Sequence, residues 1–207
     1  MIPSLAPLES LSSPGLAVIL AGGQSRRFGP NKADYRWKGR SFTAHIRQIA
    51  RDAGLNVRVV RRDQVAPCGP LGGIYTAFHR HRAPWILFLA CDMPLVRPSY
   101  LTRMMAVFHK TQPSPEALVT QIQAQAGFPI ILTRSALPRI QAQIATGDVS
   151  LRTLFQSLRL KKLPPPPSEL PRLININHRT DLSLLKSMDV GDGPCLSDTG
   201  RTGMVPA

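Results

Sequence analysis

Residues 16–33 read LAVILAGGQSRRFGPNKA, and the rest of the predicted fold is arranged around this segment. Its first five residues are all apolar, a pattern that predicts a buried strand. Gly22 and Gly23 follow directly, and because glycine has no Cβ, the backbone there can turn sharply and bring its N–H groups against an anion. Arg27 and Lys32 then supply charge that persists at any physiological pH. The stretch therefore predicts a strand followed by a loop that binds a polyphosphate.

The spacing of this loop matches neither of the common phosphate-binding fingerprints. It lacks G-x-x-x-x-G-K-[ST], the pattern of a P-loop. It also lacks G-x-G-x-x-G, the pattern of a dinucleotide-binding turn. The loop is therefore of another kind.

Length and charge bound the possible functions. A chain of 207 residues with 43% hydrophobic residues can bury one core, so we expect a single domain. The formal net charge is +14, and residues 26–62 hold eleven Lys and Arg against two acidic residues. Such a field attracts nucleotides, phosphorylated substrates, nucleic acid or an acidic protein, and charge alone does not choose among them.

The cysteines and the N-terminal residues indicate the compartment. Cys68, Cys91 and Cys195 have spacings that fit neither a disulfide framework nor a zinc motif. Residues 1–15 contain no basic segment typical of a signal peptide, and the apolar run at 16–21 is too short to span a membrane. We therefore expect a cytoplasmic protein with no membrane partner.

Apolar runs alternate with stretches of helical periodicity along the chain. The runs predict strands at 16–20, 57–60, 85–90, 117–122, 129–132 and 173–177, and the helical stretches predict helices at 42–53, 71–78, 101–108, 137–144, 151–155 and 182–185. This alternation predicts an α/β fold, a three-layer sandwich with a mostly parallel, Rossmann-like sheet. We expect residues 16–188 to form the domain, residues 1–15 a flexible arm, and residues 189–207 a disordered tail.

Candidate site residues follow the predicted strands. The glycine-rich loop, Asp63, Asp92 and Asn177 each come at or just past the end of one of them. Ligands of α/β sheets bind beyond the carboxyl ends of the strands. We therefore expect these features to converge on one edge of the sheet and to form an active site there.

Five motifs, taken in chain order, resemble those of one enzyme family. The loop resembles the signature L-A-G-G-x-S-x-R-M-G-x-x-K-A, with Phe28 in place of the methionine. Residues 69–74 resemble G-P-L-x-G-I, 91–94 match C-D-x-P, 127–129 resemble G-x-P, and 175–177 match N-x-N. By these motifs the chain resembles the MobA-like nucleotidyltransferases, and among them the molybdenum cofactor guanylyltransferases.

The resemblance implies a fold of the nucleotide-diphospho-sugar transferase type and a specific reaction. GMP would pass from GTP to the terminal phosphate of molybdopterin or Mo-molybdopterin, with release of pyrophosphate. Arg27, Lys32 and Asp92 would be catalytic, and Mg²⁺ would be the cofactor, held by Asp92 and Asn177. The implied nucleotide-binding residues are Leu20, Ala21, Gly22, Gly23, Lys32, Asp63, Gly69, Pro70, Leu71 and Asp92. We expect the backbone N–H groups of residues 21–23 to face the nucleotide.

The chemistry of this reaction explains the types of residue. The nucleophile is a phosphate monoester whose second pKa is about 6, so it is ionised at pH 7. A general base is therefore unnecessary, and none of the histidines is a candidate for one. The protein has to align two anions and neutralise the charge that develops on the leaving group.

Several alternatives stay open on the sequence. The L-A-G-G and G-P-L-x-G patterns favour guanine, but cytidylyl transfer to molybdopterin, or nucleotidyl transfer to another phosphorylated acceptor, remains an alternative. A catalytically silent nucleotide-binding regulator is a further alternative, against which the intact Lys32 and Asp92 argue. The positive charge also suits an acidic molybdoenzyme or chaperone as a partner, whereas no motif supports nucleic-acid binding.

Overall fold

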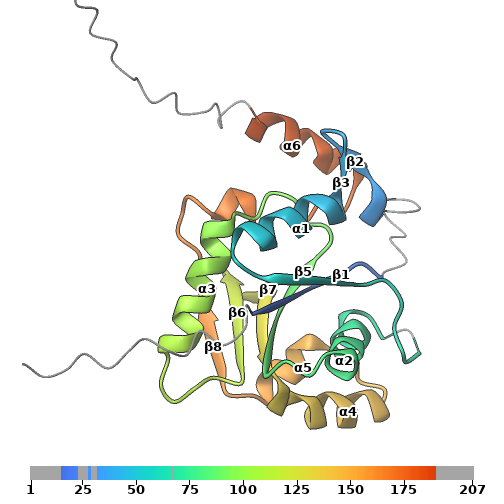
Figure 1. Ribbon diagram of the computed structural model, residues 1–207, viewed down its shortest axis with the longest axis vertical. Helices are drawn as coiled ribbons and strands as arrows, with labels where there is room; N and C mark the ends of the chain where they lie inside the picture. The colour runs from blue at the N-terminus through green and yellow to red at the C-terminus, as the bar shows by residue number, and fades with distance from the viewer. Residues whose placement is uncertain (1–14, 23–27, 29–31, 67, 190–207) are drawn as a thin grey trace, which may run out of the picture.

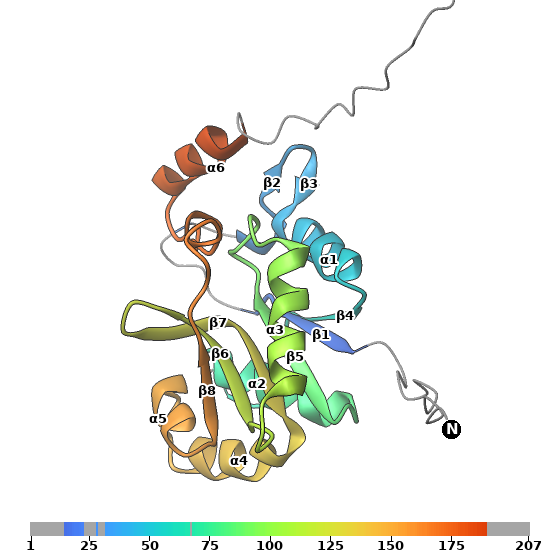
Figure 2. The same cartoon turned by 90° about the vertical axis from the view of Figure 1, so that its left-hand side faces the viewer.

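A six-stranded sheet lies between two layers of helices, as Figures 1 and 2 show. The computed structural model describes residues 15–22, 28, 32–66 and 68–189. The sheet contains β1 (Leu16–Leu20), β4 (Asn56–Val60), β5 (Trp85–Ala90), β6 (Ala117–Ile122), β7 (Gln125–Thr133) and β8 (Leu160–Leu163), in the order β4-β1-β5-β7-β6-β8. β7 runs antiparallel to both of its neighbours, and the other neighbouring strands are parallel. The predicted three-layer α/β sandwich with a mostly parallel sheet is therefore confirmed.

Each helix belongs to one face of the sheet because successive side chains of a strand point to opposite faces. One face carries α1 (Phe42–Asp52) and α3 (Pro98–Lys110), and the other carries α2 (Pro70–Arg80), α4 (Leu137–Ala145) and α5 (Leu151–Gln156). In β1, Ala17 and Ile19 pack with the first pair of helices, whereas Val18 packs with the other three. β5 also buries side chains on both faces, which is why its sequence is continuously apolar.

The strand order reverses at β1. The chain passes from β1 through α1 to β4 on one side of it, and then through α2 to β5 on the other side. The next strands along the chain thus lie on opposite sides of β1, and such a switch point opens a crevice beyond the carboxyl ends of the strands.

The segment 173–177 is not a strand, so this part of the prediction is wrong. It follows a short 3₁₀ turn, Leu170–Arg172, and buries Leu173 and Ile176 in two different clusters. Because these buried positions are three residues apart, they do not give the alternation that a strand requires. The backbone N–H of Ile176 donates instead to the carbonyl oxygen of Asp92, at 2.8 Å.

Two elements of the structure have no counterpart in the sequence prediction. β8 is an edge strand that exposes Lys161 and Lys162, so it lacks an apolar run. A hairpin of β2 (Arg36–Trp37) and β3 (Arg40–Ser41) has only two residues in each strand, too few for a periodic signal.

A third apolar cluster lies beside the two that cover the faces of the sheet. This Phe28 cluster contains Phe28, Phe42, Leu95, Ile176 and Leu185, with Tyr35, Trp37 and Leu182 packed against it. The rings of Phe28 and Tyr35 meet edge to face, with their centroids 5.3 Å apart. The cluster joins the β2–β3 hairpin and the last helix, α6 (Leu182–Asp189), to the start of α1. In Figures 1 and 2 the hairpin and α6 lie at the same end of the molecule.

The expected N-terminal arm and C-terminal tail stay predictions, because residues 1–14 and 190–207 lie outside the described residues. Across the described ranges, none of the helices combines the length and the apolar character that a membrane span requires.

Glu116 is a buried carboxylate that joins three elements just before the start of β6. Its side chain accepts from Arg139 Nη1 of α4 at 2.7 Å and from the backbone N–H of Arg159, just before β8, at 3.0 Å. The bond from Arg159 holds the pKa of Glu116 below its ordinary value, although burial acts in the opposite direction. Glu116 therefore fixes β6, α4 and β8 at the edge of the sheet opposite the carboxyl ends.

We expect Glu116→Gln to lower the free energy of unfolding at pH 7 by about 1–3 kcal/mol, because it removes a charged acceptor from buried hydrogen bonds. Folding lowers the pKa of Glu116, so its contribution is present above the ordinary value of 4.5 and is lost as the pH falls through the folded value. Urea unfolding of both proteins at pH 7 and at about pH 3 measures this difference, which is expected to shrink in acid. Arg139→Gln, which removes a 44% exposed partner, is the control and is expected to cost about 0–1 kcal/mol. An equal difference at both pH values would contradict the ionic role.

Candidate active site

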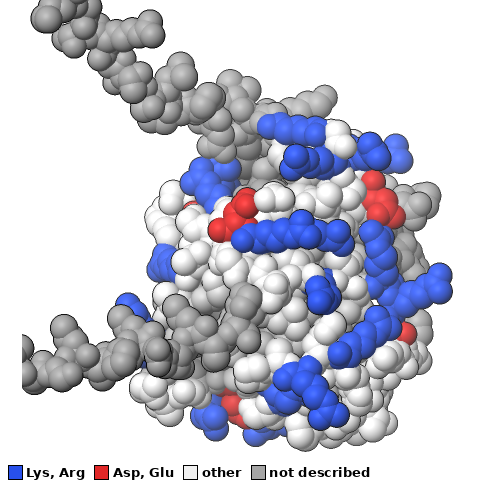
Figure 3. Space-filling view, in the orientation of Figure 1, with Lys and Arg blue, Asp and Glu red and all other residues white. Residues whose placement is uncertain are grey.

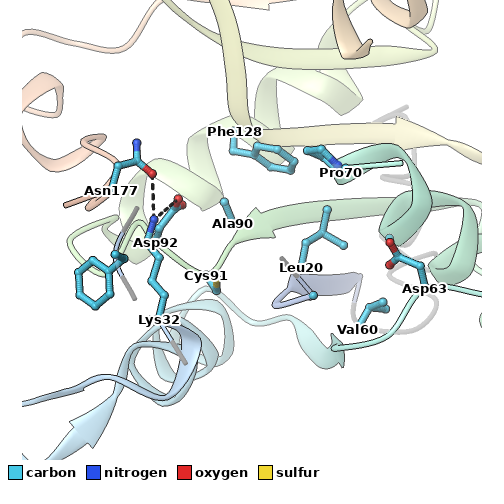
Figure 4. A pocket seen from close by; sticks show the side chains of 14 residues that line it. Leu20, Lys32, Val60, Asp63, Pro70, Ala90, Cys91, Asp92, Phe128 and Asn177 are labelled. Carbon is cyan, nitrogen blue, oxygen red and sulfur yellow. Dashed lines mark hydrogen bonds and ion pairs between the residues drawn. The ribbon is translucent and has the colours of Figure 1, made fainter. Parts of the chain in front are cut away.

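A cavity of about 390 Å³ opens beyond the carboxyl ends of three neighbouring strands (Figure 4). Its lining includes Val60, Leu20 and Ala90, which are the last residues of β4, β1 and β5. The volume lies within the range of small-molecule pockets, roughly 300–1,000 Å³. The edge of the sheet at which the sequence predicts a site therefore carries a cavity that a small molecule can fill.

A buried lysine holds one end of the cavity together. Lys32 lies in a 3₁₀ turn, η1 (Lys32–Asp34), and is 6% exposed. Its Nζ donates to Asp92 Oδ2 at 2.9 Å and to Asn177 Oδ1 at 2.9 Å, the two contacts drawn in Figure 4. The ring of Phe28 lies under the same ammonium, with its centroid 5.9 Å from Nζ. Two hydrogen bonds and an aromatic ring thus surround the Lys32 charge.

Asn177 is held in this arrangement by contacts on both sides of it. The preceding residue, Ile176, is fully buried and bonded through its N–H to the Asp92 carbonyl. Asp181 Oδ2 accepts from the backbone N–H groups of Asn177 and His178, each at 2.8 Å. The bond from His178 is the largest reason that the pKa of Asp181 is lowered. These contacts bring Asn177 to Lys32, from which it is separated by 145 residues in sequence.

The oxygen atoms at this end of the cavity fit a divalent cation. Asp92 Oδ1 is buried, and within the described part of the chain it has no hydrogen-bond partner. With Oδ2 and the amide oxygen of Asn177 it forms the all-oxygen donor set that Mg²⁺ prefers. No group of three or more His, Cys, Asp or Glu among the described residues could hold a metal ion without help. The set therefore fits a Mg²⁺ ion whose other ligands come from phosphates or water.

Asp63 and the first turn of α2 form the opposite end of the cavity (Figure 4). The carboxylate of Asp63 lies so close to the helix that a Cβ on Gly72 would be 2.7 Å from Oδ2, so a larger residue there would displace the carboxylate. Gly69 and Pro70 of the same segment line the cavity. Burial raises the pKa of Asp63, and the positive charge of Arg80 opposes this effect. This end thus offers a carboxylate acceptor beside the positive end of a helix dipole.

The loop after β1 approaches β4 more closely than the sequence predicts. The backbone N–H of Ala21 donates to the carbonyl of Val60 at 2.8 Å, so it extends the sheet and does not face a ligand as expected. A Cβ on Gly22 would lie 2.8 Å from the carbonyl oxygen of Arg61, which explains the glycine at this position. Of the three expected N–H groups of residues 21–23, that of Ala21 is therefore excluded.

The structure brings most of the predicted site residues to one cavity. Its lining includes Leu20, Gly22, Lys32, Asp63, Gly69, Pro70, Asp92 and Asn177. Leu71 and Ala21 are not among them: the side chain of Leu71 is fully buried in the core, and Ala21 pairs with β4. Gly23 and Arg27 lie outside the described residues, so their roles stay predictions.

Six further residues line the cavity that were absent from the predicted set: Phe28, Val60, Gly73, Ala90, Cys91 and Phe128. Four of them stand inside the signature loop or the motifs at 69–74, 91–94 and 127–129, namely Phe28, Gly73, Cys91 and Phe128, and these motif positions are the signal that could have found them. Val60 and Ala90 end strands, and any residue at the end of a central strand can reach this crevice.

The described lining offers little acid–base chemistry. It contains no histidine. Burial, reinforced by the charge of Asp92, raises the pKa of the Cys91 thiol to about 11, so at neutral pH it is a thiol and not a nucleophilic thiolate. The cavity is therefore equipped to bind and orient anions and cations more than to transfer protons.

Comparison with known proteins agrees with this geometry. The chain matches the model of the MobA-like NTP transferase domain over residues 17–163. It is 29% identical over 185 residues to the probable molybdenum cofactor guanylyltransferase of Bacillus licheniformis, which covers 80% of this chain and 93% of that protein.

Two solved structures share the fold. Molybdopterin-guanine dinucleotide biosynthesis protein A from Archaeoglobus fulgidus superposes with a TM-score of 0.71 at 19% identity, covering 84% of this chain and 98% of that one. A Mycobacterium tuberculosis protein solved in complex with manganese gives a TM-score of 0.55 at 19% identity, covering 84% and 100%. The family model spans most of the sheet and all of the cavity residues except Asn177. The chain therefore belongs to the MobA-like NTP transferase family, a family of nucleotidyltransferases.

Proposed function

We propose that this protein transfers GMP from GTP to the terminal phosphate of molybdopterin, or of Mo-molybdopterin, and releases pyrophosphate. Family membership and the B. licheniformis relative support nucleotidyl transfer in molybdenum cofactor biosynthesis. The observation that carries the proposal is one cavity with two different ends. Lys32, Asp92 and Asn177 form an end suited to a metal-bound triphosphate, and Asp63 with α2 forms an end suited to a base.

The proposed reaction is a single displacement at phosphorus. An oxygen of the acceptor phosphate forms a bond to the α-phosphorus of GTP. The bond from that phosphorus to the oxygen bridging it to the β-phosphorus breaks, and its electron pair leaves with pyrophosphate. The acceptor phosphate is ionised near pH 7, so no side chain has to remove a proton. The rate then depends on alignment of the two anions and on stabilisation of the developing charge.

Each residue at the phosphate end has a proposed role. Lys32 binds the triphosphate and the departing pyrophosphate, together with Arg27, which lies outside the described residues. Asp92 and Asn177 hold Mg²⁺, which when bound supplies positive charge to the phosphate oxygens. The manganese complex of the M. tuberculosis neighbour supports a divalent metal ion in this fold.

The Asp63 end is proposed to bind the guanine. Guanine presents an amino donor beside a ring N–H, and a carboxylate can accept from both, whereas cytosine offers its amino group alone on the matching edge. Leu20 supplies an apolar wall between this end and the phosphate end (Figure 4). A half-buried carboxylate and an apolar wall together favour guanine over cytosine.

A basic face beside the cavity supports a protein partner. Figure 3 shows many Lys and Arg side chains on the face that it presents. The exposed ones of the β2–β3 hairpin, α1, β4 and the two residues after β4 are Arg36, Lys38, Arg40, Arg47, Arg51, Arg58, Arg61 and Arg62. Asp34, one of the two acidic residues in this part of the chain, is already paired with Arg61 at 3.0 Å. Because Arg61 directly follows Val60 of the cavity lining, this face reaches the site. We propose that an acidic molybdoenzyme or chaperone docks there.

The first test is the choice of nucleotide. Incubation of the protein with Mg²⁺, molybdopterin and each of the four NTPs in turn is expected to yield the dinucleotide product with GTP alone, as measured by product mass. Conversion with CTP and none with GTP would overturn the assignment of the base. Absence of conversion with any NTP, in a protein that still binds GTP, would favour the nucleotide-binding regulator.

The second test concerns Asp92. Asp92→Asn keeps the shape of the side chain but removes the charge that the metal ion and Lys32 require, so we expect a loss of turnover on the order of 10²–10³ with the fold retained. Asp34→Asn is a matched control, since it removes an exposed carboxylate paired with Arg61 outside the cavity. Steady-state kinetics and circular dichroism of both variants measure the effect. Normal turnover of Asp92→Asn would exclude a catalytic role for this carboxylate.

The third test separates function from stability at Asp63. Folding raises the pKa of Asp63, so above this raised pKa the ionised carboxylate lowers the free energy of unfolding. This penalty disappears as the pH falls below the ordinary value of 3.8. We therefore expect Asp63→Asn to weaken GTP binding while its thermal midpoint at pH 7 equals or exceeds that of the wild type. Calorimetry with GTP and thermal unfolding measure the two effects. A lower midpoint with unchanged GTP affinity would make Asp63 a structural residue.

A further inference from the structure

Lys32 occupies the coordination space that a divalent cation would need. Its Nζ lies 2.9 Å from Asp92 Oδ2 and 2.9 Å from Asn177 Oδ1, the two side chains proposed to hold the metal ion. The side chain of Lys32 is 8% exposed and that of Asp92 is 19% exposed, so solvent screens this ion pair only weakly. The ammonium therefore neutralises the carboxylate from within the protein.

With Lys32 in place, a divalent cation finds both Asp92 Oδ2 and Asn177 Oδ1 already accepting from an ammonium, and only Asp92 Oδ1 is without a hydrogen-bond partner among the described residues. Asp92 carries one negative charge, which Lys32 already balances, so a metal ion that enters beside Lys32 meets a neutral pair and a like charge. Mg²⁺ also gives up its water ligands reluctantly. A metal ion gains Asp92 Oδ2 and Asn177 Oδ1 as ligands, and an uncompensated carboxylate charge, when Lys32 withdraws its ammonium.

A bound nucleoside triphosphate can draw the Lys32 ammonium away from Asp92 and Asn177. Lys32 has a flexible four-carbon stem, and its ammonium is a compact charge that can turn from one anion to another. The cavity that Lys32 lines is the proposed nucleotide site, so the triphosphate places several negative oxygens within reach of the ammonium. When Lys32 turns to those oxygens, Asp92 and Asn177 become available to the metal ion that the nucleotide carries.

We propose that Lys32 is an internal counterion that keeps free divalent cations out of the Asp92–Asn177 site. The substrate is then the metal–nucleotide complex, and the protein holds no metal ion there before the nucleotide binds. This inference rests on the proposed function, because it takes the triphosphate as the anion that releases Lys32. It assigns Lys32 a role in the nucleotide-free protein that differs from its role with the triphosphate bound.

The test is metal binding to the full chain without nucleotide or acceptor. Mn²⁺ serves as the probe, and its free concentration is followed by electron paramagnetic resonance. The wild type is expected to bind Mn²⁺ with a Kd above about 1 mM, and Lys32→Met is expected to bind it at least about tenfold more tightly, because the carboxylate has lost its counterion. The double variant Lys32→Met/Asp92→Asn is expected to lose that gain.

Two controls make the result specific. Arg62→Met removes one exposed positive charge next to Asp63 of the cavity lining, so it reports the effect of net charge alone, and it is expected to bind Mn²⁺ as the wild type does. Lys32→Gln removes the charge but keeps a hydrogen-bond donor toward Asp92, and it replaces Lys32→Met if thermal unfolding shows that the methionine variant does not fold. Each variant is compared with the wild type by the same titration.

The outcomes separate this inference from the proposed function. Binding of Mn²⁺ by the wild type as tightly as by the Lys32 variants would overturn the counterion role, whatever the enzyme does with GTP. An equal gain in Arg62→Met would also overturn it, because the effect would then be that of net charge. Tighter binding in the Lys32 variants alone would support the counterion role even if the wild type failed to convert GTP, and that failure would count against the proposed reaction only.

Discussion

Parallel pairing of β1 with both β4 and β5 is the constraint on which the site depends. In both registers Leu20 is opposite the last residue of the neighbouring strand, Val60 on one side and Ala90 on the other. The three strands therefore end level, and the backbone bonds from Ala21 to Val60 and from Cys91 to Leu20 carry the pairing beyond them. Segments that are distant in sequence are thus delivered to one cavity, which no local interaction could achieve.

The charged groups of the cavity lower the stability of the fold and suit the cavity to charged ligands. Burial disfavours the ionised form of Asp63, and the Lys32–Asp92 pair is desolvated at a cost that its mutual attraction has to offset. The apolar faces of the sheet and the buried Glu116 contacts at the opposite edge supply stability elsewhere. Groups held in unfavourable surroundings are typical of sites that bind charged ligands, because the ligand relieves the cost.

Much of this arrangement could be predicted from the sequence, and the exceptions share a cause. β1 and β5 are recognisable because strands buried on both faces are continuously apolar, and Asp92 is recognisable because it follows such a strand. Asn177 was found through a motif, although the strand expected to carry it does not exist. Its position depends on Ile176, whose N–H donates to the distant Asp92, and on Asp181, whose carboxylate accepts from the N–H of Asn177 within a turn. Hydrophobic periodicity encodes neither contact. The hydrogen bond from the Ala21 N–H to the Val60 carbonyl also joins distant segments, so the sequence alone does not predict it. β8 gives no strand signal because its two middle residues are lysines.

The Phe28 cluster has a consequence for the order in which the protein is made. Lys32 and Asp92 leave the ribosome well before Ile176 and Leu185, which pack into that cluster and bring Asn177 to the lysine. The central strands β1, β4 and β5 all precede residue 91, whereas the contacts of Lys32 with both Asp92 and Asn177 cannot all form until residue 177 has been synthesised. A growing chain that ends before residue 177 therefore has the cavity residues of β1, β4 and β5 but leaves Lys32 without one of its two hydrogen-bond partners.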